Sequence, residues 1–170
     1  APPEAESNMT LVGLQPEHVH SARAGIQESV PDPADEARTA FFGLAQRSGV
    51  ALTPEANGKW STTIVLNRGR SQRVIFDLDR ELYGTRFLSL HSVSLDLKSS
   101  RLVDGLARSL LEATGRLGIG GYAISAPRSL VYAYSLPLHG LSPELFRGLI
   151  VIVATAADSP EKLVTGKDER

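Results

Sequence analysis

Residues 130–150 read LVYAYSLPLHGLSPELFRGLI, and the order of residue types in this stretch indicates a strand that leads into a helix. Every second residue from Leu130 to Leu136 is a leucine or a tyrosine, which is the apolar period of a strand. Pro137 ends the alternation because it has no N–H for a ladder hydrogen bond. Ser142 can cap a helix, and Pro143 suits its first turn. We therefore predict a strand, a short link and a helix with one buried side.

Two segments upstream of this unit have helical periodicity. The first begins with Asp32-Pro33, and the second is capped by Ser99 or Ser100. The apolar side of the second helix is predicted to contain Leu102, Val103, Leu106, Leu110, Ala113 and Leu117. Residues 159–161 are expected to start a separate helical turn after the last helix, because a proline occurs there.

Four segments before residue 130 alternate with the period of a strand, at residues 60–66, 74–78, 87–97 and 122–126. The third segment changes its apolar phase at His91-Ser92, which predicts a β-bulge there. Short links join the first three segments, so we expect an antiparallel meander. The full order α–β–β–β–α–β–β–α predicts a two-layer α+β domain, in which helices cover one face of an antiparallel sheet.

The charges are unevenly distributed along the 170 residues, although the net charge is only −1. Residues 1–36 contain seven acids and one base, whereas the remaining residues contain twelve acids and seventeen bases. Residues 1–31 are also poor in large apolar side chains. We therefore predict an acidic, mostly flexible arm over residues 1–31 and a single, mildly basic domain over residues 32–170.

The composition excludes several classes of protein. The sequence contains no cysteine, which excludes disulfides and thiol catalysis and suits a reducing compartment. The longest apolar run, Leu149–Ala157, is about half of the roughly 20 residues that a membrane helix needs. No basic and then apolar signal segment is visible at the N-terminus. We therefore predict a cytoplasmic protein that makes no membrane contact.

No group of residues carries a recognisable catalytic signature. The strongest carboxylate cluster is Asp77, Asp79 and Glu81, in which Asp77 and Asp79 would share one face of a strand. Such acids could serve acid–base or magnesium chemistry, but a solvated sheet face is their more ordinary setting. His18 and His20 lack a further ligand at the spacing of a metal site. We therefore predict a non-enzymatic protein without catalytic residues, metal or cofactor.

Arginines gather on the predicted hairpin between the first two strands. Arg68, Arg70 and Arg73 lie there, and Arg80 and Arg86 follow in the next connection. Clustered arginines can contact phosphates. However, no aromatic residues are interleaved with them, as binding of single-stranded nucleic acid would favour. Nucleic-acid contact through Arg68, Arg70 and Arg73 is therefore the alternative function, as in an accessory factor of DNA or RNA metabolism or of the stress response.

Apolar residues remain after the predicted core is filled. Val65, Ile75 and Val131 fall on the sheet face that the alternation assigns to solvent, which favours a partner-binding surface. The alternative is that a loop or the N-terminal arm covers them. The leucine stripe of the second helix is also long, and Leu102, Leu106 and Leu110 are candidates for dimerisation. Ordinary core packing explains those three leucines equally well.

The order of elements and several local patterns resemble a known family. The relevant segments are VIFDLD, FLSLHSVSLDL, SSRLVDGLARSLLEATGRLG, GGYAISAPRSLVYAYSLPL and LSPELFRGLIVIVATAAD. Leu136-Pro137-Leu138 followed by Leu141-Ser142-Pro143-Glu144 is the most specific part. Over about residues 34–165 the chain resembles the type III secretion chaperone-like fold and, within it, the bacterial sensory transduction regulator (YbjN) family.

This resemblance implies a small, non-enzymatic, cytoplasmic homodimer that binds another protein. It further implies that an extended segment of the partner lies along a sheet edge and apolar grooves, because a free strand edge supplies main-chain hydrogen bonds. Classical secretion chaperones are markedly acidic, whereas residues 37–170 of this chain are mildly basic. The charge therefore favours the regulator-like branch over an export chaperone, with a partner protein that the sequence does not identify.

Overall fold

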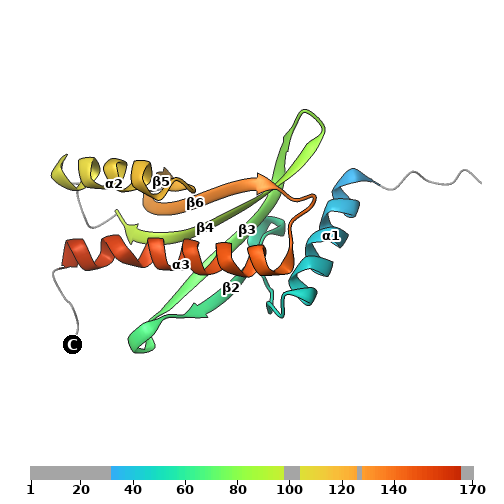
Figure 1. Ribbon diagram of the computed structural model, residues 1–170, viewed down its shortest axis with the longest axis horizontal. Helices are drawn as coiled ribbons and strands as arrows, with labels where there is room; N and C mark the ends of the chain where they lie inside the picture. Colours follow the sequence, from blue (N-terminus) through green and yellow to red (C-terminus); the bar gives the residue numbers. More distant parts are fainter. Residues whose placement is uncertain (1–31, 98–103, 126–127, 166–170) are drawn as a thin grey trace, which may run out of the picture. The chain divides into compact units, whose positions relative to one another are not determined.

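The computed structural model of the chain describes residues 32–97, 104–125 and 128–165 (Figure 1). Its elements are α1 (Pro33–Arg47), β1 (Thr53–Pro54), the 3-10 turn η1 (Ala56–Gly58), β2 (Trp60–Val65), the 3-10 turn η2 (Asn67–Gly69), β3 (Ser71–Leu82), β4 (Thr85–Asp96), α2 (Asp104–Leu117), β5 (Gly121–Ser125), β6 (Ser129–Pro137) and α3 (Pro143–Thr165). The predicted N-terminal arm, with His18 and His20, lies outside the described residues, as do both predicted caps of the second helix.

Within the described residues, six strands form one antiparallel sheet in the order β1-β2-β3-β4-β6-β5. The predicted meander corresponds to β2, β3 and β4. Strand β6 pairs with β4, so β5 lies at one edge of the sheet although it precedes β6 in the chain. The two-residue strand β1 was not predicted, because two residues are too few to show an alternation. The predicted α+β class with an antiparallel sheet is confirmed.

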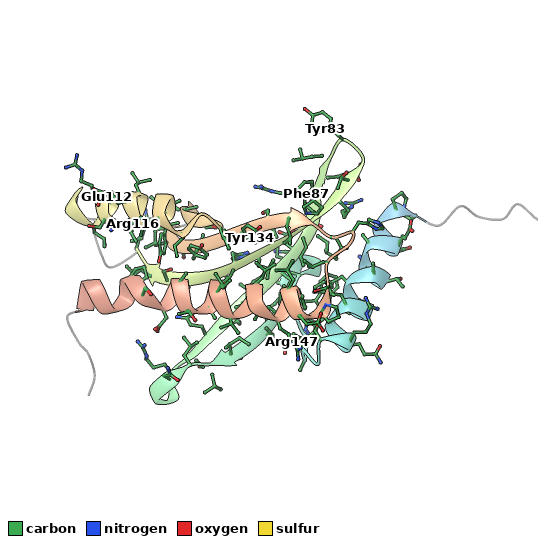
Figure 2. The ribbon with its side chains drawn as sticks, viewed as in Figure 1. Tyr83, Phe87, Glu112, Arg116, Tyr134 and Arg147 are labelled. Carbon is green, nitrogen blue, oxygen red and sulfur yellow. The ribbon has the colours of Figure 1, made fainter. Side chains whose placement is uncertain are left out.

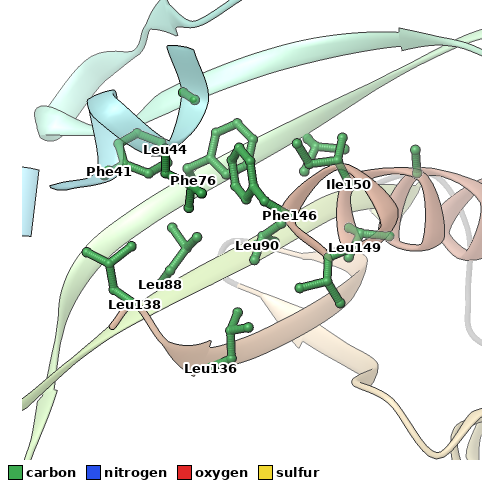
Figure 3. Packing of buried hydrophobic residues seen from close by; sticks show 14 of the residues in the cluster. Phe41, Leu44, Phe76, Leu88, Leu90, Leu136, Leu138, Phe146, Leu149 and Ile150 are labelled. Carbon is green, nitrogen blue, oxygen red and sulfur yellow. The ribbon is translucent and has the colours of Figure 1, made fainter. Parts of the chain in front are cut away.

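An aromatic cluster joins the sheet to two helices. The ring of Phe76 on β3 lies 5.4 Å from that of Phe41 on α1 and 5.6 Å from that of Phe146 on α3, measured between centroids. All three side chains are fully buried, and leucines of β4 and β6 extend the cluster (Figure 3). Helices α1 and α3 therefore cover the same face of the sheet.

Two of the predicted helix starts are confirmed. The Asp32 carboxylate accepts a hydrogen bond from the N–H of Ala34 at 2.9 Å, which caps α1. The Ser142 hydroxyl accepts one from the N–H of Leu145 at 3.2 Å, which caps α3. These caps satisfy main-chain donors that have no partner within the first helical turn.

Helix α2 packs against β5 on a different side from α3. Tyr122 directs its hydroxyl to α3, where it donates to the carbonyl oxygen of Ala156 at 2.7 Å. A Cβ atom added to the preceding residue, Gly121, would lie 2.7 Å from Cγ2 of Thr114 on α2. Since neighbouring residues of a strand point to opposite faces, α2 and α3 contact opposite faces at β5. Helices α1 and α3 therefore cover the sheet face that the sequence predicted to be covered, whereas α2 contacts the opposite face at β5.

Two local predictions require correction. The bulge expected at His91-Ser92 lies between Val93 and Leu95, where the register between β4 and β6 shifts. The separate turn expected at residues 159–161 does not form, because α3 continues through Pro160 to Thr165. A proline lacks the N–H that would bond to the carbonyl four residues earlier. Here that carbonyl belongs to Ala156, and the hydroxyl of Tyr122 satisfies it instead.

Candidate functional site

Strand β2 is only half covered by its neighbour at the sheet edge. The two residues of β1 pair with Trp60 and Ser61, and among the described strands the rest of β2 pairs with β3 alone. The N–H of Glu55 donates to the carbonyl of Lys59 at 2.8 Å on the β1 side, and the N–H of Leu66 donates to the carbonyl of Arg70 at 2.7 Å on the β3 side. The main-chain groups of Lys59 thus point to the outer edge, and those of Leu66 point to β3.

The open part of this edge contains Thr63, Ile64 and Val65, which we call the β2 edge. Alternate residues of a strand direct their main-chain groups to the same side. Ile64 therefore bonds to β3, as Leu66 does, whereas Thr63 and Val65 turn their N–H and C=O groups outward, as Lys59 does. Four main-chain groups in a row are then available to an added strand. Val65, at 75% exposure, adds an apolar side chain beside them.

The opposite edge of the sheet, β5, is less accessible. The N–H of Tyr122, which would otherwise point to a new strand, donates to Oγ1 of Thr114 on α2 at 3.1 Å. Helix α2 therefore occupies the beginning of this edge. Only the second half of the five-residue strand remains, where Ile124 is exposed. The β2 edge is the better candidate for strand addition.

The structure separates the three residues predicted to bind a partner. Val65 lies at the β2 edge, whereas Ile75 is half-buried on β3 and pairs with Ser61, in the part of β2 that β1 covers. Val131 belongs to β6 and retains only 5% exposure. Its burial leaves little side-chain surface for a partner. Val131 pairs with Ala123 of β5, the strand against which α2 packs. Of the three residues, Val65 is therefore the one that offers apolar surface at the β2 edge.

The predicted carboxylate cluster does not come together as one site. Asp77 pairs with Nζ of Lys59 at 2.7 Å, and Glu81 pairs with Arg86 at 3.0 Å. A register shift between Asp77 and Arg80 breaks the alternation on which their shared face depended. Among the residues that the structure describes, no group of three or more His, Asp or Glu side chains is arranged to hold a metal ion.

Electrostatics near Asp77 also oppose acid–base chemistry. Burial alone would raise the pKa of Asp77, but the hydrogen bonds from Lys59 and from the N–H of Asp79 outweigh it, and the pKa is lowered. Burial and the nearby charge of Lys59 lower the pKa of His91, although Asp77 acts in the opposite direction. At neutral pH the carboxylate is thus ionised and the imidazole is neutral. Neither group is poised to exchange a proton near pH 7 with the other.

Two arginines of the first hairpin have partners within the chain. Arg70 contacts the buried carboxylate of Asp158 on α3 at 2.6 Å, and Arg73 contacts Glu55 at 3.3 Å. The side chain of Arg68 lies outside the described part of the chain. Because Arg70 and Arg73 are already neutralised by carboxylates, the hairpin is a weaker phosphate site than the sequence suggests. Nucleic-acid contact at Arg68, Arg70 and Arg73 stays a prediction.

The leucines predicted for dimerisation differ in their exposure. Leu110 is almost fully buried, Leu106 is half-buried, and Leu102 lies outside the described residues. The most exposed apolar residue described on this helix is Leu111, at 71% exposure, which the predicted leucine stripe did not include; Leu117, a member of the stripe, is less exposed. Figure 2 shows the neighbouring Glu112 and Arg116 projecting from the same helix. Leu111 rather than Leu110 is therefore accessible to a second chain.

Comparison with known proteins gives matches among solved structures. No family model and no curated protein matches the sequence. A chain of the ExsC–ExsE complex is 14% identical with a TM-score of 0.54, over 79% of this chain and 97% of that chain. A chain of the HopA1–SchA chaperone–effector complex is 12% identical with a TM-score of 0.54, over 78% of this chain and 98% of that chain.

These neighbours agree with the architecture described above. At 12–14% identity the likeness shows the fold and leaves activity open. No helix among the described residues is long and apolar enough to cross a membrane. The chain has the α+β fold that the sequence predicted, the type III secretion chaperone-like fold.

Proposed function

We propose that this chain is a non-enzymatic protein-binding module, a chaperone, adaptor or regulator of the kind that the resemblance to the YbjN family implies. In this proposal an extended segment of the partner protein pairs with the β2 edge and continues the line of β1. The outward main-chain groups of Thr63 and Val65 carry the proposal. The two neighbouring folds support it, because both come from complexes and one of these is described as a chaperone–effector complex.

The surroundings of the β2 edge indicate which segments would fit. Val65 offers apolar contact on one face of the added strand, and Ile75 lies on the same face four residues beyond Ser71, the partner of Val65. The charges nearby are already paired, Lys59 with Asp77 and Arg73 with Glu55. Selection would then depend on apolar side chains at alternate positions of the partner and on main-chain hydrogen bonds more than on charge.

Replacing Thr63 by proline tests this function directly. Proline removes the outward N–H of Thr63 but none of the bonds between β2 and β3, so the protein should keep its thermal unfolding temperature while losing its partner. Full-length wild-type protein on a column selects the partner from an extract of the cells that produce it, and calorimetry with the purified partner then gives the affinity. We expect a loss of at least about tenfold.

Ile64→Pro is the matched control for this experiment. The same substitution one residue later removes a bond to β3 and should lower the unfolding temperature, whereas Thr63→Pro should not. Equal partner affinity for wild-type and Thr63→Pro protein would reject strand addition at the β2 edge. An extract that yields no partner for the wild-type protein would leave the binding function without support.

We also propose that the protein is a homodimer that associates through α2. Leu111 carries this part of the proposal, because it is the most exposed apolar residue described on that helix. Leu111→Arg should convert a dimer into a monomer in light scattering at micromolar concentration, since it places a charge in an apolar contact. Gln46→Arg on α1 is the control and should leave the mass unchanged. A strictly monomeric wild-type protein would contradict the proposal.

A further inference from the structure

The end of the β3–β4 hairpin extends beyond the rest of the sheet. Strand β3 pairs with β2 only as far as Phe76, and β4 pairs with β6 only from Phe87 onward. Residues 79–85 therefore have no neighbouring strand among the described residues, and at Arg86 the carbonyl accepts a hydrogen bond from the N–H of Leu138 at 3.0 Å. Figure 1 shows this hairpin projecting away from the sheet and from α3. We call residues 79–86 the hairpin tip.

The turn of the hairpin tip contains a residue that does not suit it. Tyr83 and Gly84 are the two central residues, and both have positive φ, 49° and 73°. A two-residue turn with positive φ at both positions favours asparagine or glycine, because a bulky side chain is strained there. The ring of Tyr83 is fully exposed, so no contact with the described residues compensates for the strain. A strained residue without an internal contact points to a role outside the chain.

The side chains of the hairpin tip are sorted between two faces. Arg80 pairs with Phe87, and Leu82 pairs with Thr85, so these four side chains lie on one face. Leu82 is exposed, and Figure 2 shows Tyr83 at the end of the hairpin with Phe87 near its base.

The other face of the tip is polar and neutralised. It carries the pair of Glu81 and Arg86, which form an ion pair at 3.0 Å. Arg80 on the first face forms no ion pair within the described part of the chain. One face of the tip thus carries the apolar side chains of Leu82 and Phe87 beside Arg80, a cation that is unpaired among the described residues.

We propose that Tyr83 and Leu82 insert into an apolar pocket of a folded partner protein, with Arg80 pairing with a carboxylate at the rim of that pocket. Tyrosine and arginine are the residue types that contribute most often to such anchors. The tip carries two acids and two arginines, so it has no net charge to attract an anionic membrane. A protein pocket is therefore the occupant that the tip fits.

This contact goes beyond strand addition and does not depend on it. The β2 edge adjoins Ser71, at the start of β3, whereas the hairpin tip begins after Asp77 and includes the end of the strand at Leu82. The 12 residues from Ser71 to Leu82 span roughly 35 Å along an extended strand. Substitutions at the two places can therefore be read separately.

Site-specific crosslinking identifies the partner of the tip. The photoreactive residue p-benzoylphenylalanine is placed at position 83 of the full-length protein, in the cells that produce it, and at Gln46 on α1 as a control. We expect one protein adduct from position 83 that position 46 does not give. No adduct, or the same adducts from both positions, would overturn the proposal.

The crosslinked partner, purified, is then titrated with Tyr83→Asn protein. Asparagine suits the positive φ, so the variant should unfold at a temperature about 2–4 °C higher than the wild type. Its affinity for the partner should nevertheless fall about 30-fold. A gain in stability together with a loss of affinity is a result that a purely structural role of Tyr83 would not produce. Unchanged affinity would overturn the proposal.

Two further measurements separate this contact from membrane binding and from strand addition at the β2 edge. Vesicles of phosphatidylcholine, with and without phosphatidylserine, should not bind the protein. If the wild-type protein binds vesicles and Tyr83→Asn protein does not, the hairpin tip binds a membrane and the proposal of a protein pocket is wrong. Thr63→Pro protein should still give the adduct from position 83. If Thr63→Pro abolishes partner binding and Tyr83→Asn does not, the β2 edge is the site and the inference about the hairpin tip fails alone.

Discussion

Replacement of Phe76 by alanine is expected to lower the free energy of unfolding by about 3–5 kcal/mol. The side chain is fully buried, and its ring contacts Phe41 of α1 and Phe146 of α3. Removing it leaves a cavity at the place where both helices meet the sheet. Since domains are typically stable by about 5–15 kcal/mol, this single change removes a large part of the total. Urea unfolding followed by circular dichroism measures it.

Phe42→Ala is the matched control for Phe76→Ala. Phe42 is the next residue after Phe41 on α1, its ring contacts Trp60, and it is partly exposed. The same truncation should therefore cost roughly 1–2 kcal/mol, since less apolar area returns to water. Equal losses for the two variants would show that the aromatic cluster does not hold the helices on the sheet as described.

Gly120→Ala is expected to be nearly as damaging, by about 2–5 kcal/mol. Gly120 has a φ of 66°, and an added Cβ would lie 2.5 Å from the carbonyl oxygen of Ala133 and 3.1 Å from the Tyr132 hydroxyl. That hydroxyl donates to the carbonyl of Ile119. The methyl group would push the link between α2 and β5 away from β6, because a main-chain atom cannot move aside as a side chain can.

Gly118→Ala separates the two causes of this loss. Gly118 has a similar φ of 63°, but an added Cβ would meet nothing within 4 Å. Its replacement should cost only the strain of an alanine with positive φ, about 1–2 kcal/mol. Urea unfolding of both variants gives the comparison. If Gly118→Ala and Gly120→Ala lose the same free energy, the close approach to Ala133 does not contribute.

The elements of this fold could be predicted because their signals are local. The alternation from Leu130 to Leu136 and the caps at Asp32 and Ser142 depend on residues close together in the chain, and the structure reproduces them. The predicted position of the bulge in β4 is wrong by about two residues, because a change of apolar phase shows that a bulge occurs but not which pairing absorbs it.

The candidate site was less predictable, because it depends on contacts distant in sequence. Val65 was correctly assigned to the solvent-facing sheet face, but nothing local shows that β1 covers only half of β2. Val131 has the same strand pattern, yet it pairs with β5, the strand against which α2 packs, and is buried. The sequence near Arg70 does not indicate an ion-pair partner, but the fold places Asp158 of α3 in contact with it. Tyr83 has a signal in the sequence that the prediction did not use, a bulky residue before glycine in a short link.

The proline in α3 has an evolutionary consequence. Pro160 leaves the carbonyl of Ala156 without its helical donor, and the Tyr122 hydroxyl takes that place from the neighbouring strand. The two residues thus compensate for each other although they are far apart in the sequence. A lineage that replaces Tyr122 by phenylalanine would leave the carbonyl of Ala156 without a hydrogen-bond donor. A lineage that replaces Pro160 would restore an N–H at that position, and this N–H would compete with the Tyr122 hydroxyl for the same carbonyl. We therefore expect substitutions at these two positions to occur together among descendants of this chain.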